Sequence, residues 1–447
     1  MRRPSAQPRP LTGGAVRAAG SQVVTAVTGA LTTLVLARML GPAGAGVYAI
    51  SLSLFLGLLT VGSLGLQTGV SYLVGAGRWS ARRALAQTQL MALLLGFLSA
   101  GVGIGVSELV PSAFQGLGTT SVLLTAASVP CALSWTFASY VALAIDHYEL
   151  YSVPPALQSS LTLVAAPLLA SKHGAQGAVA ALALSNAVAA LVTLFAVARL
   201  VRKRSGSRGE RGRLWEALGF GLQTHASNVL SFLNYRADMF ILNAYAGEAD
   251  VGRYSIAVSF TTAVWLLPRA LSTLVVPRVA LLSSAKGDET EAHRAMVETK
   301  SIRHTTLLVL ASSAFLAAAL VVIVVLLYGP NFRPAIVLGL ILLPGTALLG
   351  IAGVLGSIIV GRGRPTLTLW AALVTTPVAV VLYLVLVPKL GAVGAATAST
   401  LSYTFGFVIG AWLYRRAVGP GVIQAMIPTR DELADYRRLV RRRREAV

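Results

Sequence analysis

Two ten-residue stretches that lie 206 positions apart share one pattern of small residues. Residues 41–50 read GPAGAGVYAI and residues 247–256 read GEADVGRYSI, so both contain G-x-A-x-x-G-x-Y-x-I. A second pair lies 217 positions apart, where residues 172–178 read KHGAQGA and residues 389–395 read KLGAVGA. Turns rich in small residues resemble each other by chance, but chance does not readily keep two such offsets. The pattern predicts two similar halves.

The composition indicates a protein of the lipid bilayer. Of 447 residues, 55% are hydrophobic and 12% are charged, which leaves too little polar surface for a water-soluble globule and excludes collagen and disorder. The charges gather between apolar runs of about 20 residues, the length of helix that crosses ~30 Å of hydrocarbon. We expect an all-α polytopic protein with about twelve spans, near residues 16–38, 46–73, 86–106, 120–143, 153–171, 176–198, 217–243, 252–279, 304–328, 335–360, 366–387 and 391–413.

The basic residues that give the net charge of +21 alternate by side. With the N-terminus inside, the inner segments carry 30 of the 37 basic residues, and the outer loops hold only Lys172, Arg333 and Lys389. This asymmetry places both termini in the cytoplasm and makes a nucleic-acid partner unnecessary. Residues 1–18 are basic like a secretory signal, but the apolar run that follows is too long for one, so we expect an uncleaved first span.

The repeat and the charge clusters together predict the domain organisation. Each half has an even number of spans, so both halves enter the membrane from the same side and form a parallel repeat. Thr429 and Glu432 have capping-box spacing, and the arginines that follow either belong to an amphipathic helix on the inner leaflet or only enforce topology. The expected segments are a cytoplasmic N-terminus (1–15), two six-helix bundles (16–200 and 214–416), a basic linker (201–213) and a cytoplasmic basic tail (417–447).

A polar stripe recurs at the first offset. On the first span, hydroxyl residues spaced by three or four positions share one helix face. Adding 206 gives a second stripe that ends at the carboxylate of Asp238. Either the two stripes line a cavity between the halves, as in a repeat-built transporter, or the hydroxyls only allow close helix packing. The stripe residues are Ser21, Thr25, Thr28 and Thr32 in the first half, and Gln223, Ser227, Ser231 and Asn234 in the second.

Charged residues inside spans are functional candidates because they are costly there. Arg236 and Arg269 are predicted either to face a cavity or to pair with carbonyls or Asp238, although Arg236 and Asp238 lie about 160° apart on one helix. Arg38 and Arg253 lie near the outer ends of their spans, which favours snorkelling to headgroups. Because guanidinium forks suit phosphate oxygens, all four arginines are candidates for binding an anionic headgroup. Asp238 is the candidate site for a coupling proton or Na⁺.

Four stretches carry a resemblance to a known family: residues 37–50, their partial repeat at 247–256, residues 328–335 and the turn at 361–365. They are similar to the polysaccharide transporters of the multidrug/oligosaccharidyl-lipid/polysaccharide flippase superfamily. The resemblance implies a V-shaped pair of six-helix bundles in the bacterial cytoplasmic membrane. It also implies secondary, alternating-access transport of undecaprenyl-pyrophosphate-linked oligosaccharide for a surface polysaccharide such as O-antigen, beside glycosyltransferases and a polymerase. Twelve spans depart from the fourteen that many members have.

Several kinds of site have no signal in this sequence. It contains no P-loop motif and no HExxH, and Cys131 has no second cysteine, so we propose no cofactor, metal or catalytic residue. Two other functions stay open. A cation-coupled multidrug exporter of the same superfamily should carry acidic residues in its first span, which has none. A membrane glycosyltransferase, polymerase or ligase needs an acid or base at a water-exposed face, for which the short outer loops leave little room.

Overall fold

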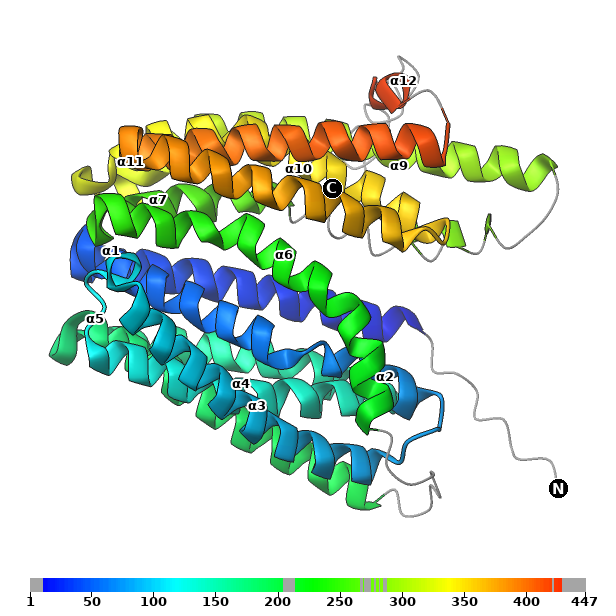
Figure 1. Cartoon of the computed structure of the whole chain (residues 1–447), viewed down its shortest axis with the longest axis horizontal. Helices are drawn as coiled ribbons and strands as arrows, with labels where there is room; N and C mark the ends of the chain where they lie inside the picture. Colours follow the sequence, from blue (N-terminus) through cyan, green and yellow to red (C-terminus); the bar gives the residue numbers. More distant parts are fainter. Residues whose placement is uncertain are drawn as a thin grey trace, which may run out of the picture. The chain divides into compact units, whose positions relative to one another are not determined.

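In the part of the chain that it describes, the computed structural model consists of helices joined by short turns, with no strand there (Figure 1). The described residues are 11–203, 214–265, 268, 275–276, 279–280, 282–283, 288–419 and 422–427. The α-helices are α1 (Leu11–Ser63), α2 (Leu66–Gly75), α3 (Ala81–Leu109), α4 (Thr119–Ala144), α5 (Tyr148–Lys203), α6 (Leu214–Ala246), α7 (Glu248–Thr262), α9 (Asp288–Ile323), α10 (Pro334–Gly361), α11 (Pro365–Ala417) and α12 (Val422–Met426). Short 3₁₀ or π segments are η1 (Pro111–Phe114), η2 (Ala263–Trp265), η3 (Val324–Tyr328) and η4 (Pro330–Phe332).

The protein is a multi-pass membrane protein. Seven helices of the described part are long and apolar enough to cross a bilayer. Three of them, α1, α5 and α11, each cover two of the spans predicted from the sequence, and the other four cover one each. The helices α6 and α7 occupy the two remaining predicted spans, the second of which is described only in part.

Glycines at matching repeat positions mark the bends between consecutive spans. The backbone of α1 turns at Gly41 (φ 67°), and Gly247 (φ 79°), at the equivalent position, separates α6 from α7. At the second offset, α5 turns at Gly174 (φ 57°) and α11 at Gly391 (φ 53°). Positive φ is strained for residues with a side chain but not for glycine. The repeated glycines therefore have a conformational reason to recur.

Contacts divide the chain into two compact units, which are described separately. The first unit comprises Met1–Ser255 and Leu327–Phe332, and the second comprises Ile256–Leu326 and Arg333–Val447. The repeat predicted that the two halves meet at the linker, residues 201–213. In the structure, residues 214–255 group with the first unit, because α6 packs on α2 and α1. The predicted halves, 16–200 and 214–416, stay a prediction about the repeat.

The first unit is built on the close packing of α1 and α4 with α5, and of α3 with α4, which lie side by side in Figure 1. Leu36 and Tyr48 of α1 are buried against Ala166, Ala170 and Ala178 of α5. Small side chains let the helix backbones approach each other, which is how helices associate where lipid supplies no hydrophobic drive.

In the second unit, α10 packs against α11 and α9. A buried ion pair fixes the turn between α10 and α11. Arg362 donates from Nε and Nη2 to the two carboxylate oxygens of Glu298 at 2.8 Å and 2.6 Å, and the Glu298 side chain is only 2% exposed. Hydrogen bonding to this carboxylate raises the pKa of the Arg362 guanidinium. Arg362, which the sequence analysis counted among the basic residues that set topology, thus also holds the turn in place.

Some sequence predictions concern residues outside the described part. These are the N-terminal segment up to residue 10, most of the basic linker, the amphipathic helix expected after residue 428, and Arg269.

Candidate functional site

The polar stripe of the first half lies against α5. Ser21 Oγ donates to the carbonyl of Ser152, and Thr28 Oγ1 donates to Ser159 Oγ at 2.8 Å. Thr25 and Thr32 bond back to carbonyls of their own helix, four residues earlier. These contacts match the packing alternative for this stripe, because its hydroxyls already have partners. A role for these residues in lining a cavity stays a prediction.

The stripe of the second half follows α6. Ser227, Ser231 and Asn234 are half-buried, while the side chain of Gln223 lies outside the described part. The Oδ1 atom of Asn234 is buried and accepts no hydrogen bond among the described residues. A buried polar atom without a partner is rare, so Asn234 is a candidate contact for a ligand.

Asp238, at the end of this stripe, is buried, with 1% of its surface exposed. The hydroxyl of Tyr254 in α7 donates to Oδ2 at 2.7 Å, and the backbone N–H of Met239 donates to Oδ1 at 2.7 Å. Sequence analysis did not identify Tyr254 as part of the site. A signal existed, since Tyr254 is the tyrosine of the repeated motif. At the offset of 206, Tyr254 is equivalent to Tyr48 and Asp238 is equivalent to Thr32.

We expect Tyr254→Phe to lower the free energy of unfolding by about 1.5–3 kcal/mol, because the buried carboxylate loses a hydroxyl donor. Tyr48→Phe is the matched control. In the first half, the residue equivalent to Asp238 is Thr32, which carries no charge and donates to the carbonyl of Thr28. The same substitution should therefore cost less there. Thermal unfolding of the purified variants in detergent measures both. Equal losses would show that Tyr254 stabilises the protein by packing alone.

Arg236 lies in α6, two residues before Asp238, and is half-buried. It makes no hydrogen bond or salt bridge among the described residues, although its charge lies near enough to the Asp238 carboxylate to interact with it. A guanidinium in a span without a hydrogen-bonded protein partner retains its donors for a ligand or for water. Arg236 is therefore the strongest candidate, within the described part, for contacting an anionic group.

The other two described candidates, Arg38 and Arg253, bind one loop, residues 327–332. Arg38 donates from Nε to the carbonyl of Leu327, and Arg253 donates from Nε to the carbonyl of Asn331 at 3.3 Å. Arg253 also forms an ion pair with Asp250 at 2.8 Å. Their guanidinium groups have partners in the protein. Both arginines therefore hold a loop, a role that the predicted snorkelling to headgroups did not include. A contact of either with substrate stays a prediction.

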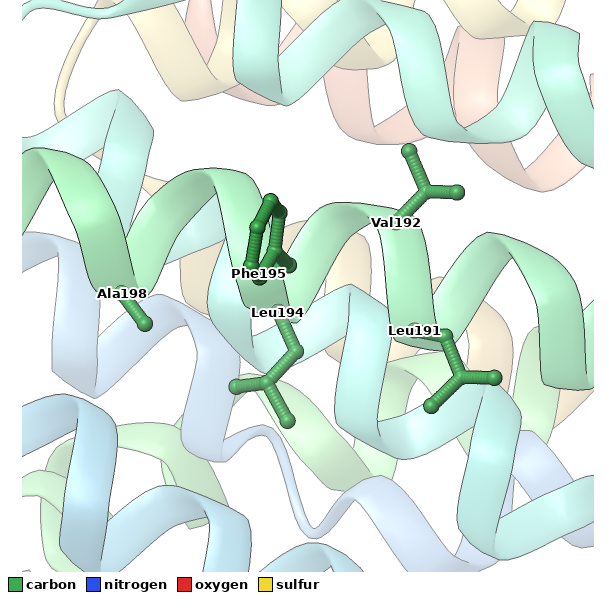
Figure 2. A pocket seen from close by; sticks show the side chains of 5 residues that line it. All are labelled: Leu191, Val192, Leu194, Phe195 and Ala198. Atoms are coloured by element: carbon green, nitrogen blue, oxygen red, sulfur yellow. The ribbon is translucent and has the colours of Figure 1, made fainter.

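One apolar groove of ≈ 520 Å³ follows a single face of α5. Figure 2 shows its lining, Leu191, Val192, Leu194, Phe195 and Ala198, none of which offers a polar atom to orient a ligand. Beside it, the Arg199 guanidinium carbon lies 4.0 Å from the Phe195 ring centroid. The equivalent pair at the offset of 217 is Arg416 and Trp412, where the same distance is 4.3 Å. Such cation–π pairs suit the ends of membrane helices. Among the described residues, no group of three His, Cys, Asp or Glu side chains is placed to hold a metal ion.

Comparisons with known proteins give the fold and the family. The chain resembles the lipid II flippase MurJ in an inward closed conformation, with a TM-score of 0.74, 14% identity, and coverage of 92% of this chain and 89% of that one. It also resembles an inward-facing MATE multidrug transporter of the MOP superfamily, with a TM-score of 0.67, 17% identity, and coverage of 88% and 94%. The all-α fold class predicted from the sequence is confirmed, and these two proteins are by name a flippase and a transporter.

A curated relative adds a weaker match. The probable low-salt glycan biosynthesis flippase Agl15 of Haloferax volcanii is 24% identical over 174 residues, 39% of this chain and 36% of that protein. The match thus spans about a third of the relative's length. The family described as polysaccharide biosynthesis protein matches residues 35–337, more than half of the chain, and this region includes both copies of the glycine motif, Arg236 and Asp238. The chain belongs to this family of polysaccharide biosynthesis proteins.

Proposed function

We propose that the protein is a flippase that moves a lipid-linked oligosaccharide, carried on a polyprenyl pyrophosphate, across the bacterial cytoplasmic membrane by alternating access. Family membership supports a role in polysaccharide biosynthesis, and the fold supports transport. In this proposal both termini are cytoplasmic, and glycosyltransferases and a polymerase make and consume the substrate on opposite sides of the membrane.

The observation that carries the substrate class is Arg236, a half-buried cation in a span that makes no hydrogen bond or salt bridge among the described residues. A guanidinium in such a place attracts an anion and binds phosphate oxygens through two parallel hydrogen bonds. In this proposal Arg236 contacts the pyrophosphate, and Arg269 is a second contact at another depth of the membrane.

The multidrug alternative differs from this proposal in the sign of the substrate's charge. The fold alone does not separate the two, because MATE transporters share it. A cationic drug would be repelled by Arg236, and the first span carries no carboxylate to attract one. The enzyme alternative gains no support from the similar proteins, which are flippases and transporters by name.

Charge substitutions at Arg236 test the proposal. In a deletion strain we expect Arg236→Ala to lower polysaccharide export by tenfold or more, since a charge-assisted hydrogen bond contributes roughly 1.5–3 kcal/mol. Lysine should restore export partly, because it keeps the charge and loses the fork, and glutamate should abolish export. The measurement is surface polysaccharide, together with accumulated lipid-linked intermediate, at matched membrane levels.

Arg294→Ala is the matched control for this series. It also removes one positive charge from a half-buried side chain, but this side chain forms an i,i+3 ion pair with Glu291 near the start of α9. It should export as the wild type does. Wild-type export by Arg236→Glu would instead remove the anion-binding role and return Arg236 to a structural one.

For coupling, we propose that Asp238 binds a proton or Na⁺ in one access state. Its burial and its bond from Tyr254 support this, because a buried carboxylate needs either a hydrogen-bond donor or a cation to offset its desolvation. We expect Asp238→Asn to lose the response of transport to an imposed proton or Na⁺ gradient, measured in vesicles. Full transport with an unchanged gradient dependence would assign Asp238 a purely structural role.

A further inference from the structure

Two repeat-equivalent glycines touch each other's helices through their backbones. A Cβ added at Gly46 would lie 1.7 Å from the carbonyl oxygen of Glu248, and one added at Gly252 would lie 1.9 Å from that of Pro42. Pro42 and Glu248 are themselves equivalent at the offset of 206. The contact is therefore reciprocal, as a twofold axis between two repeats requires. It leaves no room for any side chain.

An external loop of the first repeat is bound to the second repeat beside this crossing. Asn243 of α6 is fully buried, and its side-chain nitrogen donates to the carbonyls of Ala113 and Gln115, at 3.0 Å and 3.1 Å. Between these carbonyls, Phe114 packs on Phe240 with ring centroids 5.5 Å apart. The loop between α3 and α4 is thus held by one amide and one aromatic contact from α6.

The corresponding loop of the second repeat is bound in return by the first. Residues 327–332, between α9 and α10, belong to the first compact unit, because they dock on it. Arg38 of α1 donates to the carbonyl of Leu327, which joins the first repeat to this loop. Arg253 of α7 donates to the carbonyl of Asn331 and so holds the loop from within the second repeat itself. Each repeat therefore clasps the other's outer loop, and the bonds recorded for both loops end on backbone carbonyls.

We propose that the Gly46–Gly252 crossing and these two loop contacts, here called the outer clasp, form the gate that closes the external end of the transport path. The proposal rests on the proposed function, since only an alternating-access transporter must open such a gate once per cycle. A few hydrogen bonds to carbonyls suit this task, because each has a modest net free energy and exchanges readily with water. Arg38 and Asn243 then act on gating, whereas Arg236 acts on the substrate.

Reversible cross-linking tests whether the clasp must open. In a Cys131→Ser background, Arg38→Cys and Leu327→Cys, which replace residues in contact between the two repeats, are joined by a short bis-methanethiosulfonate that a reductant cleaves. We expect translocation of lipid-linked oligosaccharide in vesicles to fall at least tenfold and to recover on reduction. The control pair, Gln89→Cys and Ser134→Cys, replaces side chains in direct contact within the first repeat and should cross-link without loss. Unchanged translocation with the clasp pair cross-linked would overturn the proposal.

A second measurement needs no substrate and so separates failure of the clasp from failure of the proposed function. A cysteine at Ser231 is labelled from outside with an impermeant maleimide in Arg38→Ala protein. We expect labelling to rise about tenfold, which corresponds to about 1.4 kcal/mol of shift toward an open outer side. Lys172→Ala, which removes an exposed outer cation, should leave labelling unchanged. Equal labelling in all three proteins would overturn the clasp. Raised labelling in a protein that moves no lipid-linked oligosaccharide would support the clasp and reject only the substrate.

Discussion

Gly46→Ala and Gly252→Ala are each expected to abolish polysaccharide export while leaving the protein inserted in the membrane. The new Cβ would lie within 2 Å of a backbone carbonyl oxygen of the facing helix, and no rotamer change relieves a clash with backbone. The two helices must then separate, which holds the outer clasp open. Export in a deletion strain, normalised to membrane protein level, measures the effect.

Gly105→Ala is the matched control for these substitutions. Gly105 is also a helical glycine, but nothing lies within 4 Å of its added Cβ. Alanine should be neutral or stabilising there, by up to about 1 kcal/mol, because it favours the helix over glycine. Full export by Gly46→Ala and Gly252→Ala would show that the crossing tolerates separation and is not essential to the cycle.

Removing one partner of the Glu298–Arg362 pair is expected to destabilise the protein by about 3–5 kcal/mol, because the remaining charge stays buried without a counter-charge. Glu298→Ala leaves Arg362 with 17% of its side chain exposed, and Arg362→Ala leaves the nearly fully buried Glu298. Replacing both with apolar residues, Glu298→Leu with Arg362→Met, should recover most of the loss. Thermal and denaturant unfolding of purified protein gives these differences.

The exposed pair Arg78–Glu216 is the control for this prediction. Its N–O distance of 2.7 Å is close to that of the buried pair, but its two side chains are 46% and 34% exposed. Arg78→Ala should cost less than about 1 kcal/mol. A similar cost at both sites would mean that burial does not determine the contribution of Glu298–Arg362.

The sequence predicted best what depends on local backbone geometry. The repeated glycines 41, 174, 247 and 391 were recognisable because a positive φ restricts the residue type at each bend. The all-α class and the spans followed from hydropathy, because every backbone group in lipid must be satisfied within its own helix. These features need no knowledge of which helices are neighbours.

Features that depend on tertiary neighbours could not be derived in the same way. Periodicity found the stripe that includes Ser21 and Thr28, but not that α5, 131 positions further on, supplies their partners. Arg38 looked like a snorkelling residue because its acceptor, Leu327 O, is 289 positions away. Glu298 gave no signal, since its partner Arg362 is 64 positions further along the chain. A helix face is visible in the sequence, whereas the residue opposite it is not.

The most direct test of the proposed flippase activity is translocation by the purified protein alone. Proteoliposomes that contain a polyprenyl-pyrophosphate oligosaccharide are treated with an impermeant glycosidase, which reads how much sugar has changed leaflet over time. We expect time-dependent translocation by the wild type, none by Arg236→Glu, and no competition from lipophilic cations. Failure of the wild type to move this lipid, or transport of a lipophilic cation in its place, would contradict the proposed function.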